Sequence, residues 1–317
     1  MNMEHHTYLL PYRQVSRDIA PEPIPDGVIR IQANTIWDFA ERGKGIKIAV
    51  IDTGVDREHP DLKSAIIGGK NFTDAYQGDG SNFSDDEVHG THVAGILAAN
   101  GKIQGVAPEA KLLILKALRV DKETGKTNGK TEWIIDAIRY AIDQRVNIIS
   151  MSVGSPKEDP VLHQVIREAV ERGILVVCAA GNRGDLDHKT IEYDFPAAFN
   201  ESISVGAIGP DLKSPYFTNS NSEVDLVAPG VKILSTLPGG KYGELEGTSM
   251  AAPHVTGALA LLIPLCRKVF ERNLTETELY AQLIRRTVPL GYPASLEGNG
   301  LLDLSVPDRL QQANSTP

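Results

Sequence analysis

Residues 47–54 read KIAVIDTG, an apolar run that ends in an acid and a glycine. Such a run is typical of a buried central strand that presents a carboxylate, here Asp52, at its C-terminal end. From about residue 47 to 264, strand-like runs alternate with runs of helical spacing. Strands are expected over 111–118, 147–153 and 174–180, and helices over 132–144 and 161–170. The alternation predicts an α/β fold with a doubly wound, mostly parallel sheet flanked by helices on both faces.

Three more polar side chains stand at the ends of predicted elements. Asn182 closes a strand-like run, His89 opens a small-residue helix, and Ser249 precedes a long apolar run. A serine at a helix start is most often an N-cap, and a buried histidine is often a satisfied core residue. The acid of the first run can likewise be a helix cap. Their order along the chain, Asp, His, Asn and Ser, instead matches one known order of a Ser-His-Asp triad.

With these residues the chain resembles the subtilisin-like serine proteases (subtilases), and among them the intracellular subtilisins of Bacillus-type bacteria. The resemblance covers residue 9 to about residue 304. Four motifs carry it: Asp52-Thr53-Gly54, His89-Gly90-Thr91-His92, Ala180-Gly181-Asn182 and Gly247-Thr248-Ser249-Met250-Ala251. The resemblance implies a subtilisin-like three-layer fold and the activity of a serine endopeptidase that hydrolyses proteins and peptides.

The same resemblance implies a role for each polar residue. Ser249 would be the nucleophile, His89 the general base and later the acid, and Asp52 the group that orients the imidazole. Asn182 and the backbone N–H of Ser249 would bind the oxyanion. In subtilisin itself, loss of that asparagine lowers turnover by about 10²–10³. Two further histidines are expected to be packing residues: His92 and His254.

Substrate pockets also follow from the resemblance. Two backbone segments would pair with an extended substrate as an added strand, and would form the walls of S1, the pocket for the side chain before the scissile bond. One wall is Ser152, Val153 and Gly154, and the other is Ala179, Ala180 and Gly181. Leu118 and residues 125–131 would border S4, the pocket for the side chain three positions earlier.

Asp194 falls where relatives usually place a small residue at the foot of S1. A carboxylate there can pair with a lysine or arginine of the substrate. Arg183, directly after the predicted oxyanion residue, can neutralise this carboxylate instead. A solvated acid in an acidic loop is the third alternative, and the sequence leaves all three open.

The first 25 residues differ in character from the rest. We take residues 1–25 as an extension, 26–310 as the catalytic domain and 311–317 as a polar tail. Three prolines disfavour regular structure in the extension, so one interpretation is a loose arm: Pro21, Pro23 and Pro25.

The family resemblance implies a sharper interpretation of this extension. Intracellular subtilisins carry a Leu-Ile-Pro-Tyr-like motif that lies across the active site, and three of four residues match it in Leu9, Leu10, Pro11 and Tyr12. A proline near the scissile bond would resist cleavage. The extension is therefore predicted to hold the enzyme latent until proteolysis removes it.

Calcium is the cofactor that the resemblance implies, since subtilases commonly bind it through carboxylates and loop carbonyls. Asp61 matches an acidic ligand of the family's tight site, although the loop 99–105 looks about three residues shorter than in relatives. Glu223 and Asp225 would serve a weaker site, and the acidic loop 185–194 is a third candidate. Each acid alone is more often a solvated surface group.

Composition bounds the cellular setting. The chain has 317 residues, and its net charge of −9 argues against nucleic acid and against a basic membrane-binding face. The longest apolar run, 258–263, is too short to span a bilayer, and no leader-like stretch opens the chain. Cys178, expected to be buried, and Cys266 are separate thiols, which favours a reducing compartment. These features predict a cytoplasmic protein.

Two other interpretations compete with an active cytoplasmic endopeptidase. A pseudo-protease that only binds peptides is disfavoured because all four predicted catalytic residues are present. A secreted protease is disfavoured by the missing leader and the missing folded pro-domain. The stretch 275–304 resembles that of intracellular subtilisins, which implies a homodimer by analogy.

Overall fold

The computed structural model describes residues 6–20, 22–185 and 190–305. A nine-stranded sheet runs through the molecule in the order β15-β16-β12-β11-β10-β8-β3-β5-β4. All neighbouring strands in it are parallel except β15 and β16. Its strands are β3 (Lys47–Asp52), β4 (Ile66–Asn71), β5 (Lys111–Lys116), β8 (Ile148–Met151), β10 (Leu175–Ala179), β11 (Ile203–Ile208), β12 (Val224–Pro229), β15 (Thr287–Val288) and β16 (Leu301–Leu302).

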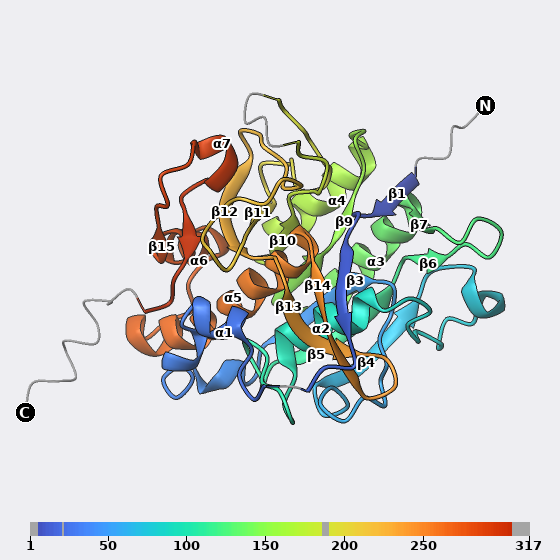
Figure 1. The fold of residues 1–317 in the computed structure, drawn as a ribbon, viewed down its shortest axis with the longest axis horizontal. Coiled ribbons are helices and arrows are strands. Elements are labelled where there is room, and N and C mark those ends of the chain that lie inside the picture. Colours follow the sequence, from blue (N-terminus) through green and yellow to red (C-terminus); the bar gives the residue numbers. More distant parts are fainter. Residues whose placement is uncertain (1–5, 21, 186–189, 306–317) are drawn as a thin grey trace, which may run out of the picture.

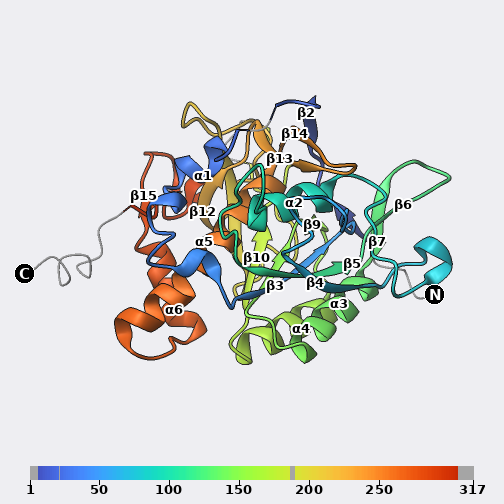
Figure 2. The same cartoon turned by 90° about the horizontal axis from the view of Figure 1, so that it is seen from below.

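Helices cover both faces of this sheet, as Figure 2 shows edge-on. In β3, Ile48 and Val50 pack into one hydrophobic cluster while Ala49 and Ile51 pack into the other, because successive side chains of a strand point to opposite faces. The first cluster includes residues of α2 and α5, and the second includes residues of α3 and α4. The helices are α1 (Asp26–Arg30), α2 (His89–Ala98), α3 (Thr131–Asp143), α4 (Pro160–Glu171), α5 (Thr248–Phe270), α6 (Glu276–Ile284) and α7 (Ala294–Glu297). The predicted three-layer α/β fold is confirmed.

The helix α5 runs through the first cluster. Its 23 residues are long and apolar enough, by length and composition, to cross a membrane, and they include the run 258–263 that looked too short. However, 89% of its most apolar 18-residue window is buried inside the protein. It is therefore a core helix, and it begins one residue before Ser249.

The N-terminal extension forms two short strands, where the prolines alone suggested a loose arm. Strand β1 (His6–Leu9) pairs antiparallel with β7 (Thr127–Lys130) and with β9 (Val153–Gly154), and lies between them in Figure 1. Strand β2 (Arg13–Arg17) pairs antiparallel with β14 (Lys241–Glu246). The remaining strands are β6 (Arg119–Val120), which pairs with β7, and β13 (Ile233–Leu237), which pairs with β14.

Pairing with two existing strand edges explains this order. The prolines stand after β2, so they do not interrupt either strand. Neither β1 nor β2 belongs to the nine-stranded sheet, so the extension pairs only with strands of the two smaller sheets. The predicted tail 311–317 and Pro21 lie outside the described residues.

Candidate active site

Asp52 and His89 meet where β3 ends and α2 begins. Nδ1 of His89 lies 2.8 Å from Oδ1 and 3.0 Å from Oδ2 of Asp52. The backbone N–H of Thr53 donates to the same carboxylate at 2.7 Å. Both side chains are fully buried, so the carboxylate depends on these donors for its stability. An ionised carboxylate only accepts hydrogen bonds, which places a proton on Nδ1 and leaves Nε2 as the basic nitrogen of a neutral imidazole.

Charge around His89 sets its pKa. Burial lowers it, while the carboxylate of Asp52 raises it, with smaller contributions from Glu87 and Asp85, and the net shift is upward. The other two buried histidines behave differently. Burial lowers the pKa of His92 to about 3 and that of His254 to about 4. Each has a ring nitrogen within 2.9 Å of a backbone carbonyl, so their predicted role as packing residues is confirmed.

Ser249 is the second residue of α5 and lies deep in the cleft. Its Oγ and Nε2 of His89 are both buried, and among the described residues neither has a hydrogen-bond partner. Most buried polar atoms are paired, because an unpaired one costs about 1–3 kcal/mol. Seven buried side-chain atoms of the described residues have no such partner, and these two stand out because they belong to the serine and the acid-bonded histidine of the predicted triad.

Asn182 is held in one orientation. Its Oδ1 accepts from the backbone N–H of Thr248 at 2.8 Å and from the hydroxyl of Thr248 at 2.9 Å. Because a backbone N–H can only donate, the amide oxygen must face Thr248 and the NH₂ must face the cleft. Nδ2 donates there to the carbonyl oxygen of Pro11 at 2.7 Å. The predicted oxyanion donor therefore already binds a carbonyl of the extension.

The extension fills the cleft on the side of the predicted S1 walls. Tyr8 pairs with Gly154 and Leu9 with Val153, so the chain runs antiparallel to that wall. The side chain of Leu10 is 3% exposed and presses on Gly154, where an added Cβ would lie 2.4 Å from its Cδ2. Leu10 thus lies against the wall predicted for the S1 pocket.

Asp194 forms the floor of this pocket. Its carboxylate lies 3.0 Å from a Cβ built on Gly154 and 2.3 Å from one built on Gly181, so it touches both walls. The contact with Asp194 leaves no space for a side chain at position 181. The φ of +116° at Gly181 is also unfavourable for any residue other than glycine.

Of the alternatives for Asp194, the contacts favour neutralisation by Arg183. The guanidinium of Arg183 lies 2.9 Å from Oδ1 and 3.1 Å from Oδ2, and Nδ2 of Asn219 donates to Oδ2 at 2.9 Å. Burial raises the pKa of Asp194, and the charge of Arg183 opposes that rise. Asp194 is 2% exposed, and both oxygens of its carboxylate accept hydrogen bonds or ion-pair contacts from the protein. It is therefore not a solvated loop acid.

Tyr12 covers the other side of the reactive centre. Its ring centroid lies 5.1 Å from that of His89, and its hydroxyl donates to Oε1 of Glu87. Burial, and then the charge of Glu87, raise the pKa of Tyr12. Beyond it, Arg13 pairs with Glu246 both in the strand register and through an ion pair of 2.6 Å. The extension therefore contacts the cleft on both sides of His89.

Comparison with known proteins agrees with this geometry. Residues 43–302 match the model of the subtilase family. The chain belongs to the subtilase family. It is 53% identical to an intracellular serine protease of Paenibacillus polymyxa, over 99% of this chain and 95% of that protein. It is 52% identical to the major intracellular serine protease of Bacillus subtilis, over 96% and 95%, and 40% identical to subtilisin E of the same organism, over 76% and 61%. This subtilase is a serine endopeptidase.

The contacts of Asp61 argue against the calcium site expected of a subtilase. Its Oδ2 accepts from the backbone N–H of Ile103 and from the hydroxyl of Tyr242, both at 3.0 Å. An added Cβ on Gly101 would lie 2.1 Å from Oδ1, so the short loop 99–105 closes directly over the carboxylate. Protein donors thus take the place that a hard cation would need.

The second predicted calcium site is also engaged by protein donors. Asp225 accepts from the backbone N–H of Ser204 at 2.7 Å and from the hydroxyl of Tyr280 at 2.6 Å. Burial raises the pKa of Asp225 to about 6. Glu223 accepts from Ser222. In the described part of the chain no three His, Cys, Asp or Glu side chains gather as metal ligands, and the loop 185–194 is described only in part. Calcium binding stays a prediction.

Two residues of this subtilase site were not predicted. Glu87 holds the start of α2, where its Oε2 accepts from the backbone N–H groups of Val88 and His89 at 2.8 Å. Lys116 is fully buried and donates to the carbonyl of Thr53 and, at 2.7 Å, to Asp86. It therefore links the residue after Asp52 to the loop before His89. A lysine at the end of the apolar run 111–116 was the available signal for it.

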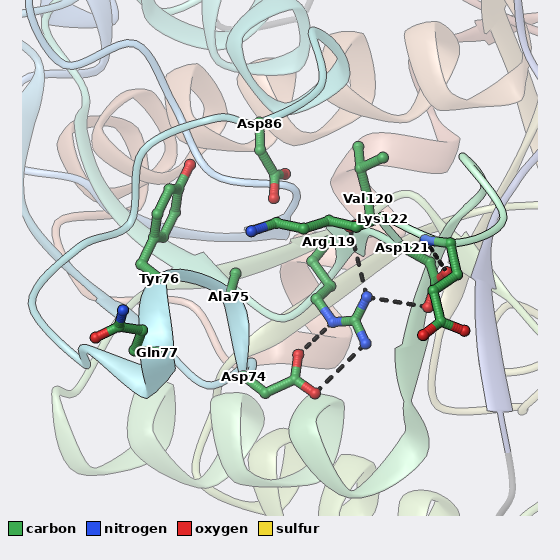
Figure 3. A pocket seen from close by; sticks show the side chains of 10 residues that line it. Asp74, Ala75, Tyr76, Gln77, Asp86, Arg119, Val120, Asp121 and Lys122 are labelled. Atoms are coloured by element: carbon green, nitrogen blue, oxygen red, sulfur yellow. Dashed lines mark hydrogen bonds and ion pairs between the residues drawn. The ribbon is translucent and has the colours of Figure 1, made fainter.

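A pocket of about 660 Å³ lies beside β6, away from the triad. In Figure 3 the guanidinium of Arg119 lies between Asp74 and Asp121, with which it forms ion pairs. Asp121 also caps the turn that leads to β7 by accepting from the backbone N–H of Thr124 at 2.9 Å. These contacts hold the β6–β7 hairpin, whose second strand pairs with the extension.

Removal of the Tyr242 hydroxyl tests whether Asp61 is bound by protein donors rather than by calcium. Tyr242→Phe leaves Asp61 with one donor fewer and should lower the free energy of unfolding by about 1–3 kcal/mol. The loss should be equal in calcium and in EDTA, as measured by thermal or denaturant unfolding. Tyr216→Phe, at an exposed ring, is the control and should change little. A calcium-dependent loss would restore Asp61 as a metal ligand.

Proposed function

We propose that Ser249, His89, Asp52 and Asn182 carry out peptide-bond hydrolysis in this subtilase. The observation that carries the proposal is the His89–Asp52 hydrogen bond, together with two buried atoms that have no partner among the described residues, Ser249 Oγ and His89 Nε2. Ser249 Oγ attacks the scissile carbonyl while Nε2 of His89 takes its proton, and Asp52 stabilises the resulting imidazolium.

The remaining steps follow from the same groups. Negative charge develops on the carbonyl oxygen, where Nδ2 of Asn182 and the backbone N–H of Ser249 can donate hydrogen bonds to it. His89 then gives its proton to the leaving amine, which departs and leaves an acyl group on Ser249. Water then attacks the acyl carbon as it loses a proton to His89, and His89 passes this proton to Ser249 Oγ, which leaves as the hydroxyl while the acid product is released.

We propose further that the extension keeps the enzyme latent by binding as a substrate that cannot react. Leu10 fills S1, so the carbonyl of Leu10 is the one that Ser249 Oγ would have to attack. The carbonyl that Asn182 binds is instead that of Pro11, one residue later. The bond after Leu10 is therefore out of register with the oxyanion donor.

Proline and tyrosine both contribute to this arrangement. Pro11 has no backbone N–H and a fixed φ, which restricts the path of the chain between β1 and β2. Tyr12 lies over His89 and shields its ring from water and from a leaving group. Pairing on both sides of the cleft, through β1 and β2, holds the shifted register in place.

Removal of the extension tests activity and latency together. A chain that begins at Asp26, or full-length protein clipped after folding, should hydrolyse a mixed peptide library, whereas intact full-length protein should not. Ser249→Ala in the clipped form should lower kcat by about 10⁴ or more. Equal activity of the intact and clipped forms would remove the latency proposal and keep the protease. Silence of both, with folded protein, would favour a pseudo-protease.

For the S1 pocket we propose an apolar preference, such as leucine, because Arg183 already neutralises Asp194. A lysine or arginine of the substrate would have to displace Arg183 from a buried carboxylate. Cleavage after basic residues should therefore be rare in the clipped enzyme, and Arg183→Ala should raise it by freeing the carboxylate. Sequencing of cleaved library peptides measures both. Frequent cleavage after lysine or arginine in the unmodified enzyme would favour the first alternative for Asp194.

The pH dependence should report the charges around His89. Its neutral form is the base, so kcat/KM should fall as the pH drops through its raised pKa. Glu87→Gln removes a negative charge that raises this pKa, so the acid limb should move to lower pH. The measurement is the pH profile of kcat/KM in the clipped enzyme, with Glu132→Gln, an exposed acid on α3, as control. An unmoved limb would contradict the assignment.

A cytoplasmic location and a homodimer are further proposals. The location is supported by two buried cysteines that form no disulfide and by relatives named intracellular serine proteases. The homodimer rests only on the resemblance of residues 275–304, and light scattering of the purified protein measures it.

A further inference from the structure

Two threonines join the extension to the catalytic domain outside S1. The hydroxyl oxygens of Thr7, in β1, and Thr131, the first residue of α3, lie 3.0 Å apart. Thr7 is fully buried and Thr131 is 5% exposed. Among the described residues, this contact is the one hydrogen bond that either hydroxyl makes. Each hydroxyl therefore depends on the other.

The position of Thr7 relative to Leu10 indicates which substrate pocket the Thr7–Thr131 contact belongs to. Between His6 and Leu10, Thr7 and Leu10 are the two buried side chains, and they stand three residues apart. With Leu10 in S1, Thr7 occupies S4, where it pairs in register with Gly129. Leu118 lies against Gly129, since a Cβ built there would be 2.8 Å from its Cδ2. The predicted border of S4 therefore surrounds a threonine.

The hairpin that carries Gly129 is also held by contacts outside the extension. Arg119 is paired with Asp74 and Asp121, as Figure 3 shows, and the turn after β6 is capped by Asp121. The hydroxyl of Thr131 is therefore held in position by the start of α3 and by the strand before it. A preorganised hydroxyl in a pocket selects a side chain that can satisfy it.

We propose that Thr131 is a specificity residue that selects threonine or serine at P4, the fourth residue before the scissile bond. The inference rests on the proposed function, in which the extension lies in the cleft as a substrate does. Preferred substrates are extended peptides with a hydroxyl residue three positions before an apolar P1 residue. A valine at P4 has the shape of threonine but leaves the hydroxyl of Thr131 buried without a partner.

The test pairs isosteric changes on both partners. Full-length enzyme is folded, clipped to remove the extension, and given two peptides, Thr-Tyr-Leu-Leu-p-nitroanilide and Val-Tyr-Leu-Leu-p-nitroanilide. The kcat/KM for the threonine peptide should exceed that for the valine peptide by about tenfold. In Thr131→Val the ratio should fall to about one, whereas Thr131→Ser should keep the preference. Thr277→Val, on the exposed surface of α6, should leave the ratio unchanged.

The outcomes separate the inference from the function beneath it. Equal rates for the two peptides in the unmodified enzyme, or an unchanged preference in Thr131→Val, would overturn the inference alone. No hydrolysis of either peptide would overturn the proposed function and the inference with it. If Thr131→Val does not fold, Thr131→Ala takes its place. Failure of latency does not affect the ratio, because the extension is absent from the assay.

Discussion

The hydrogen bonds between His89 and Asp52 join the end of a strand to the start of a helix that lies 37 residues further along the chain. Both side chains are removed from water, so neither position is stable unless the other is in place. Lys116 reinforces this junction, because its buried ammonium group binds the carbonyl of Thr53 and the carboxylate of Asp86. The order of strands β8, β3 and β5 in the sheet is what brings these groups together.

The layered fold could be predicted because its signals are local and repeated. Ile48, Ala49, Val50 and Ile51 are all apolar, which is expected only of a strand buried on both faces. The strands of the extension could not be predicted in this way. Nothing in residues 6–17 is strongly periodic, and these strands exist because β7, β9 and β14 offer unpaired edges. Pairing of this kind depends on neighbours that are distant in sequence.

The residues of the site also differ in whether local sequence or tertiary contacts determine their role. Asp52, His89, Asn182 and Ser249 stand in distinctive local motifs at the ends of elements. In the structure Asp52 bonds to His89, and Asn182 bonds to Thr248, the residue before Ser249. The partners of Asp194 and Asp61 are set by tertiary contacts. The sequence therefore left the role of Asp194 open, and gave Asp61 as a family-like metal ligand beside a loop that looked too short. Glu87 is an ordinary residue in sequence, and only its place at a helix start gives it a role. Thr131 was predicted only as part of the S4 border, and its contact with Thr7 is visible only in the structure.

The covalent attachment of the extension has a consequence for concentration. The paired segment ends at Arg17, nine positions before α1. It therefore meets its binding site on the same chain as an intramolecular ligand, with an effective concentration of the order of millimolar. Its occupancy is independent of how dilute the protein is, whereas a separate inhibitor would dissociate on dilution. A single cut between β1 and β2 turns the part that carries β1 into a separate peptide, held by its pairing with β7 and β9, while β2 stays attached to the domain. Release is then set by mass action rather than by a change in any contact.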